Sequence, residues 1–380
     1  MKICYFGAYN TEYSRNAINL KGLKKAGVHV IECRVGKPSL NTKSRLSFMK
    51  FMLIYPITLP FRNLYSIFKG LFLFIKYRYD IIIVPYPGHF DVPAAFLLSR
   101  IIGKPVIFDF FVSFYDIFVN DRGLIAKKLI ISKILFAVER LIYKLTDVIL
   151  IDTIQHQIFL SSLFNIPADK FKILSIGADD DIYHYGTPAN DDKFNVVFYG
   201  QQSPLHGVQY IIQAAKLCEH DPGIQFFLIG DGQSYDFNVA LAKKLKLKNV
   251  FFSKLTESTG ALEFLRTGDV MLGVFQNNPK GLRSIPNKVF QGIAMGDVVL
   301  TSHSAAVASE FTHKENIYLC EPENPQAIAD AIFELRGNRE FREKIAQNGY
   351  ELYLKKFTPE AIGKKLVAIC NDIILKRHEK

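Results

Sequence analysis

The chain of 380 residues offers no sign of paired cysteines, a leader or a membrane-spanning run. Its five cysteines are scattered singly without a CxxC pair, which argues against a disulfide or zinc framework and is typical of buried thiols in a reducing compartment. The start, MKICYFGAYN, has no cleavable apolar core. The uncharged run 51–61 is well short of the roughly 20 residues that a spanning helix needs. We therefore expect a cytoplasmic protein.

Acidic residues are missing between Glu32 and Asp80, where lysines and arginines are interleaved with FMLIYPITLPF and GLFLFI. The formal charge of +11 belongs entirely to residues 1–180, because residues 181–380 are neutral as a set. Basic and aromatic residues together are typical of a surface that lies on anionic headgroups. A solvated basic face is the plainer interpretation. Nucleic acid is a third, but no recognised binding motif is present.

Motifs for common cofactors are also missing. Neither the Walker A sequence nor the G-x-G-x-x-G fingerprint follows the first strand-like segment, where Gly7 stands alone, and this argues against NAD-dependent enzymes and ATPases. We find no histidine pair at i, i+4 and no acidic cluster with metal-ligand spacing. We therefore expect no cofactor and no metal.

Strands and helices alternate along both halves of the chain. In the first half we expect strands at 2–9, 27–35, 79–87, 104–111 and 147–152, and helices at 14–26, 93–102 and 124–146. In the second half we expect strands at 194–200, 224–230, 249–253, 270–275, 298–300 and 317–320, with helices between them and at 325–336, 339–356 and 359–376. This alternation predicts parallel sheets covered by helices on both faces.

The polar segment 177–193 separates the two halves, since it combines glycine, proline and five aspartates. We predict an α/β protein with two Rossmann-like, doubly wound domains that face a cleft. The first domain is expected over residues 1–182 and the second over 191–357. A C-terminal helix within 358–380 is expected to pack back on the first domain. Ligands of such sheets bind beyond the carboxyl ends of the strands.

Three loops at predicted strand ends of the second half suit a nucleotide. They are YGQQSPLHG (199–207), LIGDGQ (228–233) and RSIPNK (283–288). Their glycines let backbone approach a ligand closely, and the helix starts supply N–H donors for an anion. The candidate residues are Gly200, Gln201, His206, Gly207, Gly230, Gly232, Arg283, Pro286, Asn287, Lys288 and Gln291.

Residues 195–357 resemble the donor-binding domain of GT-B glycosyltransferases, in particular the family 4 (group 1) set. The matching segments are VVFYG, HG, LIGDG, NVFF, GDVML, QGIAMGDVVL and NPQAIADAI, in the family's order. In the first half the resemblance covers topology and the segment SIGADDDIYHY. It implies a GT-B fold and a retaining transfer of a sugar from a nucleotide-diphosphate donor. It also implies leaving-group stabilisation by helix ends and cations, without a metal.

This sequence departs from the family's pattern at four positions. Arg283 and Gln291 stand where the family usually has a pair of glutamates, and Gln201 and His206 stand where it usually has Arg and Lys. An amide hydrogen-bonds a sugar hydroxyl but carries no charge. We therefore expect Arg283, His206 and Lys288 to hold the diphosphate, and Gln291 to contact the sugar as a candidate catalytic residue.

The first half is expected to supply acceptor contacts. Asp109, at the end of a strand, is the candidate catalytic carboxylate, and helix capping is its plainer role. Candidates on the acceptor side are Arg15, Asn16, His89 and Asp116. The expected function is assembly of a cell-surface glycan or polysaccharide on a lipid-linked or saccharide acceptor, at the cytosolic face of an anionic membrane. A sugar-nucleotide epimerase and a nucleotide-sugar-binding protein without catalysis are the alternatives.

Overall fold

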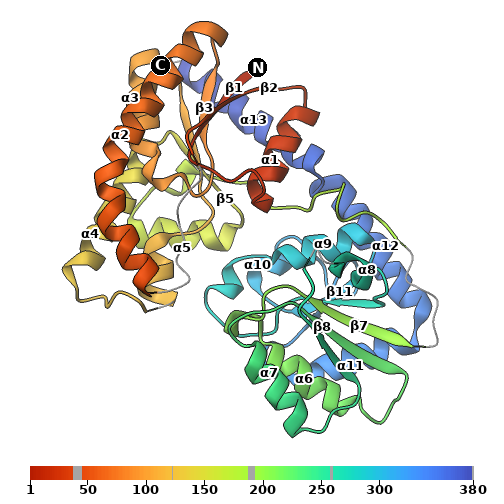
Figure 1. The fold of residues 1–380 in the computed structure, drawn as a ribbon. Helices are drawn as coiled ribbons and strands as arrows, with labels where there is room; N and C mark the ends of the chain where they lie inside the picture. Colours follow the sequence, from red (N-terminus) through yellow and green to blue (C-terminus); the bar gives the residue numbers. More distant parts are fainter. Residues whose placement is uncertain (37–44, 122, 187–192, 257–259, 379–380) are drawn as a thin grey trace. The chain divides into compact units, whose positions relative to one another are not determined.

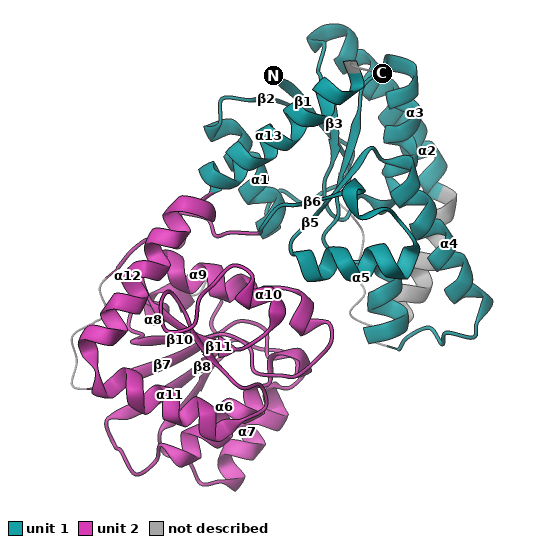
Figure 2. Ribbon diagram, turned by 180° about the vertical axis from the view of Figure 1, so that it is seen from behind, with its two compact units in different colours: residues 1–175, 359–380 teal, residues 176–358 magenta. Residues whose placement is uncertain are grey.

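The computed structural model describes residues 1–36, 45–121, 123–186, 193–256 and 260–378, and of 45–57 and 378 it describes the backbone alone. The chain forms two compact units, of residues 1–175 with 359–380 and of residues 176–358 (Figure 2). The sequence places the first boundary at 182, whereas residues 176–182 belong to unit 2, because they bond to its last helix. Ala178 N donates to the Phe357 carbonyl at 3.2 Å, and Tyr353 Oη donates to the Ala178 carbonyl at 3.2 Å.

Unit 1 is a six-stranded, fully parallel sheet in the order β2-β1-β3-β4-β5-β6 (Figure 1). Its strands are β1 (Lys2–Gly7), β2 (His29–Arg34), β3 (Ile81–Val84), β4 (Val106–Asp109), β5 (Val148–Ile151) and β6 (Phe171–Ile173). Its α-helices are α1 (Ser14–Lys25), α2 (Arg45–Tyr77), α3 (Val92–Ile102), α4 (Ile130–Leu145), α5 (Ile154–Phe164) and α13 (Pro359–His378). Short turns of helix lie at Gly88–Phe90, Asp116–Asp121 and Ala168–Lys170.

Helices cover both faces of this sheet, because successive strand residues point to opposite sides. Ile82 packs with α2, α3, α4 and α5, whereas Ile83 packs with α1 and α13. The backbones of α1 and α13 touch through two glycines: a Cβ on Gly22 would lie 2.1 Å from the Pro359 carbonyl oxygen, and one on Gly363 would lie 2.1 Å from that of Gly22. The C-terminal helix thus completes unit 1.

Unit 2 repeats the architecture with the strand order β12-β11-β10-β7-β8-β9, again fully parallel. Its strands are β7 (Phe194–Tyr199), β8 (Ile224–Ile229), β9 (Val250–Ser253), β10 (Val270–Leu272), β11 (Val298–Ser302) and β12 (Tyr318–Cys320). Its α-helices are α6 (Val208–Leu217), α7 (Tyr235–Lys244), α8 (Ala261–Leu265), α9 (Asn287–Met295), α10 (Ala305–Ala308), α11 (Pro325–Gly337) and α12 (Arg339–Lys356). The 3₁₀ turns η4 (Pro204–His206) and η6 (Gly281–Arg283) lie in its loops. The predicted α/β class and parallel sheets are confirmed.

Candidate functional site

The strand order of unit 2 locates the candidate site. The strand order changes direction between β7 and β10: β8 and β9 follow on one side of β7, and β10, β11 and β12 follow on the other. Ligands of open parallel sheets bind at the carboxyl ends of the strands at such a switch point. Gly200 follows β7 there, and the loop after β10 leads to the start of α9.

Three of the predicted glycines bring two loops into backbone contact at this edge. Gly200 and Gly230 adopt φ of 120° and 121°, and a Cβ on Gly230 would lie 2.2 Å from the Gly200 carbonyl oxygen. Gly232, with φ of 153°, would place a Cβ 2.6 Å from the Gln202 carbonyl oxygen. The positive φ favours glycine at all three positions, and at Gly230 and Gly232 a Cβ would also prevent the two loops from approaching each other.

Gln202 holds the same two loops together through hydrogen bonds, and it was not predicted from the sequence. Its buried side chain donates from Nε2 to the Gly230 carbonyl at 3.2 Å and accepts at Oε1 from Asn238 Nδ2 at 2.8 Å. Its backbone accepts from Ser234 N at 2.8 Å. The second glutamine of YGQQS was the available signal, but nothing in the sequence shows which of the two faces inward.

Lys288 is the one predicted residue whose charge is buried at this edge without a hydrogen-bond partner among the described residues. Its side chain is 6% exposed, and Nζ lies 3.7 Å from the centroid of the Phe198 ring. A Cβ on Gly200 would lie 3.7 Å from the same nitrogen. Burial lowers the pKa of Lys288 well below its usual range. A buried amine in this state gains its proton and a partner together when an anion binds beside it, so it marks a binding position for an anion.

The start of α9 adds a second source of positive potential. Pro286 occupies the N-cap position with extended backbone, and its side chain makes no capping hydrogen bond. Asn287 and Lys288 follow as the first helical residues. Free N–H groups and the helix dipole favour negative charge at such an end, and Lys288 lies in this first turn. Without an anion, the positive end of the helix dipole and the ammonium of Lys288 repel each other.

His206 lies close to Lys288 but does not act as a second cation. Its Nδ1 donates to the Gln201 carbonyl, and the Gln201 side chain is exposed. Burial, and after it the charge of Lys288, lowers the pKa of His206 to about 3. The ring is therefore neutral at physiological pH with Nε2 as an acceptor. The sequence suggests that His206 pairs with the diphosphate as a cation, whereas the lowered pKa favours Nε2 as an acceptor for a hydroxyl donor.

The remaining donor-side residues lie in the same loops. Gly207, with φ of 67°, precedes α6, and a Cβ there would lie 2.6 Å from Gln276 N in the loop after β10. Arg283 ends η6 and is half-buried. Gln291, one turn into α9, donates from Nε2 to Tyr183 Oη at 2.9 Å, so its amide is already oriented by one partner. Tyr183 was not predicted.

Asp109 in unit 1 is enclosed rather than presented to a ligand. Its carboxylate has no exposed surface and accepts from Arg15 Nε at 2.7 Å and from Asn19 Nδ2 at 2.7 Å. Arg15 is equally buried and also donates to the Leu174 carbonyl at 3.1 Å. This environment favours a structural role for both residues over the catalytic role expected for Asp109 and the acceptor contact expected for Arg15, which stay predictions. Both residues join α1 to the ends of β4 and β6.

The other acceptor-side candidates are buried as well. Asn16 donates to the Asn10 and Tyr86 carbonyls at 2.9 and 2.8 Å. His89 stacks on Phe114 with ring centroids 3.9 Å apart. Asp116 accepts at Oδ1 from Asn120 Nδ2 at 3.0 Å. These contacts favour internal roles for the three side chains, because all three are buried inside unit 1, and their contact with an acceptor stays a prediction.

Carboxylates do gather at one place among the described residues, contrary to the sequence expectation. Oxygens of Asp179, Asp180 and Asp181 lie within 4.8 Å of one another. Asp181 N donates to Asp179 Oδ1 at 3.1 Å, so part of this arrangement is a local turn. Exposed aspartates of this kind are common without an ion, and the cluster carries no assignment.

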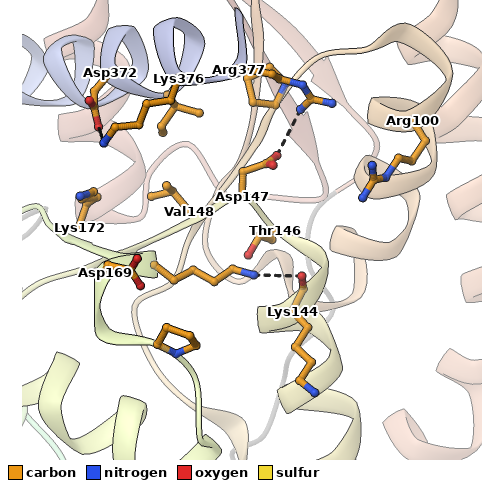
Figure 3. A pocket seen from close by; sticks show the side chains of 14 residues that line it. Arg100, Lys144, Thr146, Asp147, Val148, Asp169, Lys172, Asp372, Lys376 and Arg377 are labelled. Atoms are coloured by element: carbon orange, nitrogen blue, oxygen red, sulfur yellow. Dashed lines mark hydrogen bonds and ion pairs between the residues drawn. The ribbon is translucent and has the colours of Figure 1, made fainter. Parts of the chain in front are cut away.

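A cavity of about 710 Å³ lies in unit 1 at the amino ends of its strands, opposite the carboxyl ends at which ligands of such sheets bind (Figure 3). Six cations line it: Arg100, Lys144, Lys376 and Arg377 come from the last turns of α3, α4 and α13, and Lys170 and Lys172 come from the turn before β6 and from β6 itself. Lys376 pairs with Asp372 at 2.8 Å, and Asp147 lies 3.6 Å from Arg377. Cations at helix ends complement the helix dipole, and Lys170 Nζ donates to the Lys144 carbonyl at 3.0 Å, so most of this charge is accounted for without a ligand.

No helix in the described part of the chain is both long and apolar enough to cross a membrane.

The family model described as glycosyl transferases group 1 matches residues 179–352, all of which lie in unit 2. Among curated relatives, the lipopolysaccharide core biosynthesis glycosyltransferase LpsD of Rhizobium meliloti is 27% identical over 192 residues, covering 50% of this chain and 52% of that protein. An uncharacterized glycosyltransferase of Methanocaldococcus jannaschii is 22% identical over 221 residues, covering 55% of each. The chain spans about half the length of the curated relatives it matches.

Solved structures share the fold over nearly the whole chain. HepE of Anabaena, crystallised with UDP, has a TM-score of 0.66 at 15% identity and covers 98% of this chain and 100% of its own. Sucrose-phosphate synthase of Thermosynechococcus elongatus has a TM-score of 0.68 at 14% identity, with 99% and 100% covered. The fold is therefore GT-B. The family model thus matches the segment that forms most of unit 2, in agreement with the resemblance read from the sequence.

Proposed function

We propose that the protein is a retaining glycosyltransferase that takes a sugar from a nucleoside-diphosphate donor bound at the strand ends of unit 2. The observation that carries this proposal is the buried, unpartnered ammonium of Lys288, placed between Gly200 and the uncapped start of α9. A diphosphate satisfies both groups at once, because it supplies the negative charge that each lacks.

The roles follow from this placement. Lys288 and the N–H groups of Asn287 and its neighbours hold the diphosphate and stabilise the charge that develops as it leaves. His206 accepts at Nε2 from a hydroxyl of the donor. Gln291, fixed by Tyr183, contacts the sugar one turn further along α9. Positive charge comes from the protein itself, so the proposal includes no metal and no cofactor.

The acceptor, the nucleotide and the location are proposed from the relatives and from the charge of the chain. A lipid-linked or saccharide acceptor in cell-surface glycan assembly is suggested by the relative LpsD, whose name places it in lipopolysaccharide core biosynthesis. UDP as the nucleotide is suggested by HepE, which was crystallised with UDP-glucose. A cytoplasmic protein peripheral to the membrane agrees with the excess positive charge of residues 1–180.

The test is nucleotide release. The purified protein is incubated with a panel of nucleotide sugars, with and without a membrane extract as the source of acceptors. We expect nucleotide release from one donor, dependent on the extract and strongly reduced in Lys288→Met. Interconversion of the sugar without extract would instead identify an epimerase, and nucleotide binding without release would identify a non-catalytic homologue.

A further inference from the structure

The outer surface of unit 1 over α2, α3 and α4 is apolar to an unusual degree. On α4, five side chains that point away from the sheet are between 41% and 73% exposed: Ile130, Ile131, Ile134, Val138 and Leu141. They recur at helical spacing, so they form one stripe along the helix. The buried side of the same helix carries Ser132, Glu139, Ile142 and Tyr143.

The stripe continues across the neighbouring helices. Leu97 and Ile101 are exposed on α3, which packs against both α2 and α4. On the described part of α2 the exposed apolar residues are Phe61, Leu64, Tyr65, Phe68, Phe72 and Ile75. All three helices lie on the same side of the sheet (Figures 1 and 2). We call these exposed residues of α2, α3 and α4 the apolar face.

Negative charge is almost missing from these helices. Glu139 is the one acid in the sequence of α2, α3 and α4, and it is buried, where it accepts from Tyr115 N at 2.8 Å and from Tyr143 Oη. Basic residues border the apolar face instead. Lys127 and Lys128 are exposed just before α4, Lys133 is exposed in its first turn, and Lys144 is exposed at its end.

Other exposed helices show the ordinary pattern. On α12, Arg339 pairs with Glu343 at 2.7 Å, acids and bases alternate, and Leu354 is the one large apolar side chain that is more than a third exposed. The apolar face therefore differs from the solvated helix surfaces of the same chain. Contiguous exposed apolar surface of this kind marks an interaction site.

We propose that the apolar face docks on an anionic lipid bilayer, with the apolar side chains in the interface and the lysines on the headgroups. The proposal rests on the peripheral placement proposed above and identifies the surface responsible. A bilayer supplies an apolar interior and negative headgroups together, which matches both features of the face. A second copy of the chain fits less well, since symmetric pairing would bring two acid-free, basic surfaces together.

This placement differs from the one that sequence alone suggests. The sequence points to residues 33–79, of which 37–44 lie outside the described residues. Arg62 in that segment is not a headgroup contact, because Nη2 donates to the buried Asp91 at 2.7 Å. The structure adds α3 and α4 to this surface. From the sequence alone, the apolar residues of these two helices would be expected to pack in the core.

Vesicle flotation tests the proposal on the full chain. We expect the protein to float with vesicles of phosphatidylcholine and phosphatidylglycerol in equal parts, to stay behind with phosphatidylcholine alone, and to be released by raised salt. Ile130→Gln with Ile134→Gln and Leu141→Gln should abolish flotation. Lys127→Gln with Lys128→Gln and Lys133→Gln should weaken partitioning at least about tenfold, because each charge near an anionic surface contributes.

Matched controls use residues away from the face. Leu354→Gln on α12 and Lys243→Gln with Lys244→Gln on α7 should float as the unmodified protein does. Circular dichroism and UDP titration should be unchanged in every variant, which separates loss of docking from loss of folding or of the donor site. Equal flotation with both vesicle types, or normal flotation of the α4 variants, would overturn the proposal. So would a dimer in solution that the α4 substitutions dissociate, since the face would then be covered by a second copy.

Discussion

Lys288 Nζ lies 3.7 Å from the centroid of the Phe198 ring, so the helix that follows β10 places its first cation on the end of β7. Within the described residues the ammonium has no hydrogen-bond acceptor, and the ring face is its main electrostatic compensation. The arrangement stores an unfavourable charge at the strand ends of unit 2. An anion bound at the proposed donor site removes this unfavourable free energy, which adds to its affinity.

The pKa of Lys288 gives the first prediction. Burial lowers this pKa in the folded protein, so between the folded and unfolded pKa values the unfolded chain binds more protons, and the free energy of unfolding rises with pH. Lys288→Met should therefore raise the free energy of unfolding of the ligand-free protein near pH 7 and flatten its increase toward alkaline pH. Urea unfolding at several pH values measures both. A variant that is less stable than the unmodified protein throughout would contradict the account.

UDP binding should also take up protons. A diphosphate beside Nζ favours the charged amine and raises the pKa of Lys288, so affinity should fall as pH rises through the pKa of the free protein. Titration calorimetry in buffers of different ionisation enthalpy measures the protons exchanged. We expect uptake in the unmodified protein and much less in Lys288→Met, and equal exchange in the two proteins would remove Lys288 from the site.

His206 should remain neutral through the physiological range. Its folded pKa of about 3 lies below the unfolded value, so the free energy of unfolding should fall as pH drops below about 6.5 toward the folded pKa. His206→Gln should flatten that acid limb. Nuclear magnetic resonance should show no titration of this ring between about pH 5 and pH 8. A midpoint near the usual histidine pKa would restore the cationic role that the sequence suggests.

Gln291 should matter for transfer more than for the nucleotide. Its amide is held by Tyr183 and lies one turn beyond Lys288, so Gln291→Ala should lower turnover while affinity for UDP stays nearly constant. Tyr183→Phe is the matched control: it removes the hydroxyl that orients the amide and should lower turnover less. Parallel losses in turnover and UDP affinity for Gln291→Ala would show that the residue only supports the helix.

Asp109 should be a stability residue. Asp109→Ala leaves Arg15 buried without its partner, and breaking such a pair typically costs about 3–5 kcal/mol of unfolding free energy. Asp109→Leu combined with Arg15→Met replaces both charges by apolar groups and should recover most of the loss. Urea unfolding with UDP titration separates stability from binding. An Asp109→Asn variant of normal stability but without transfer activity would reinstate the catalytic role.

Much of this fold was predictable because apolar strands such as 81–84 and 148–151 are buried on both faces and read as continuous runs. Helix α5 was not predicted, since its apolar residues occupy both sides: Leu160 and Phe164 are buried, while Ile154 and Ile158 are exposed. The three residues of β6 are too few for a pattern.

In the site, the glycine positions and Lys288 could be chosen from the sequence, because loops at the ends of parallel strands meet at one edge. The burial of individual side chains could not be predicted in this way. Asp109 and Arg15 stand 94 positions apart, and only the folded sheet shows that they neutralise each other. The same holds for Gln202, whose inward orientation depends on Gly230 and Asn238.

The most direct test of the account is a calorimetric titration of UDP into the unmodified protein, Lys288→Met and the control Lys243→Met on α7. We predict that Lys288→Met weakens binding by about 1.5–3 kcal/mol, the loss expected for a charge-assisted hydrogen bond, while Lys243→Met binds normally. Unchanged affinity in Lys288→Met, or an equal loss in both variants, would contradict a diphosphate site at the start of α9.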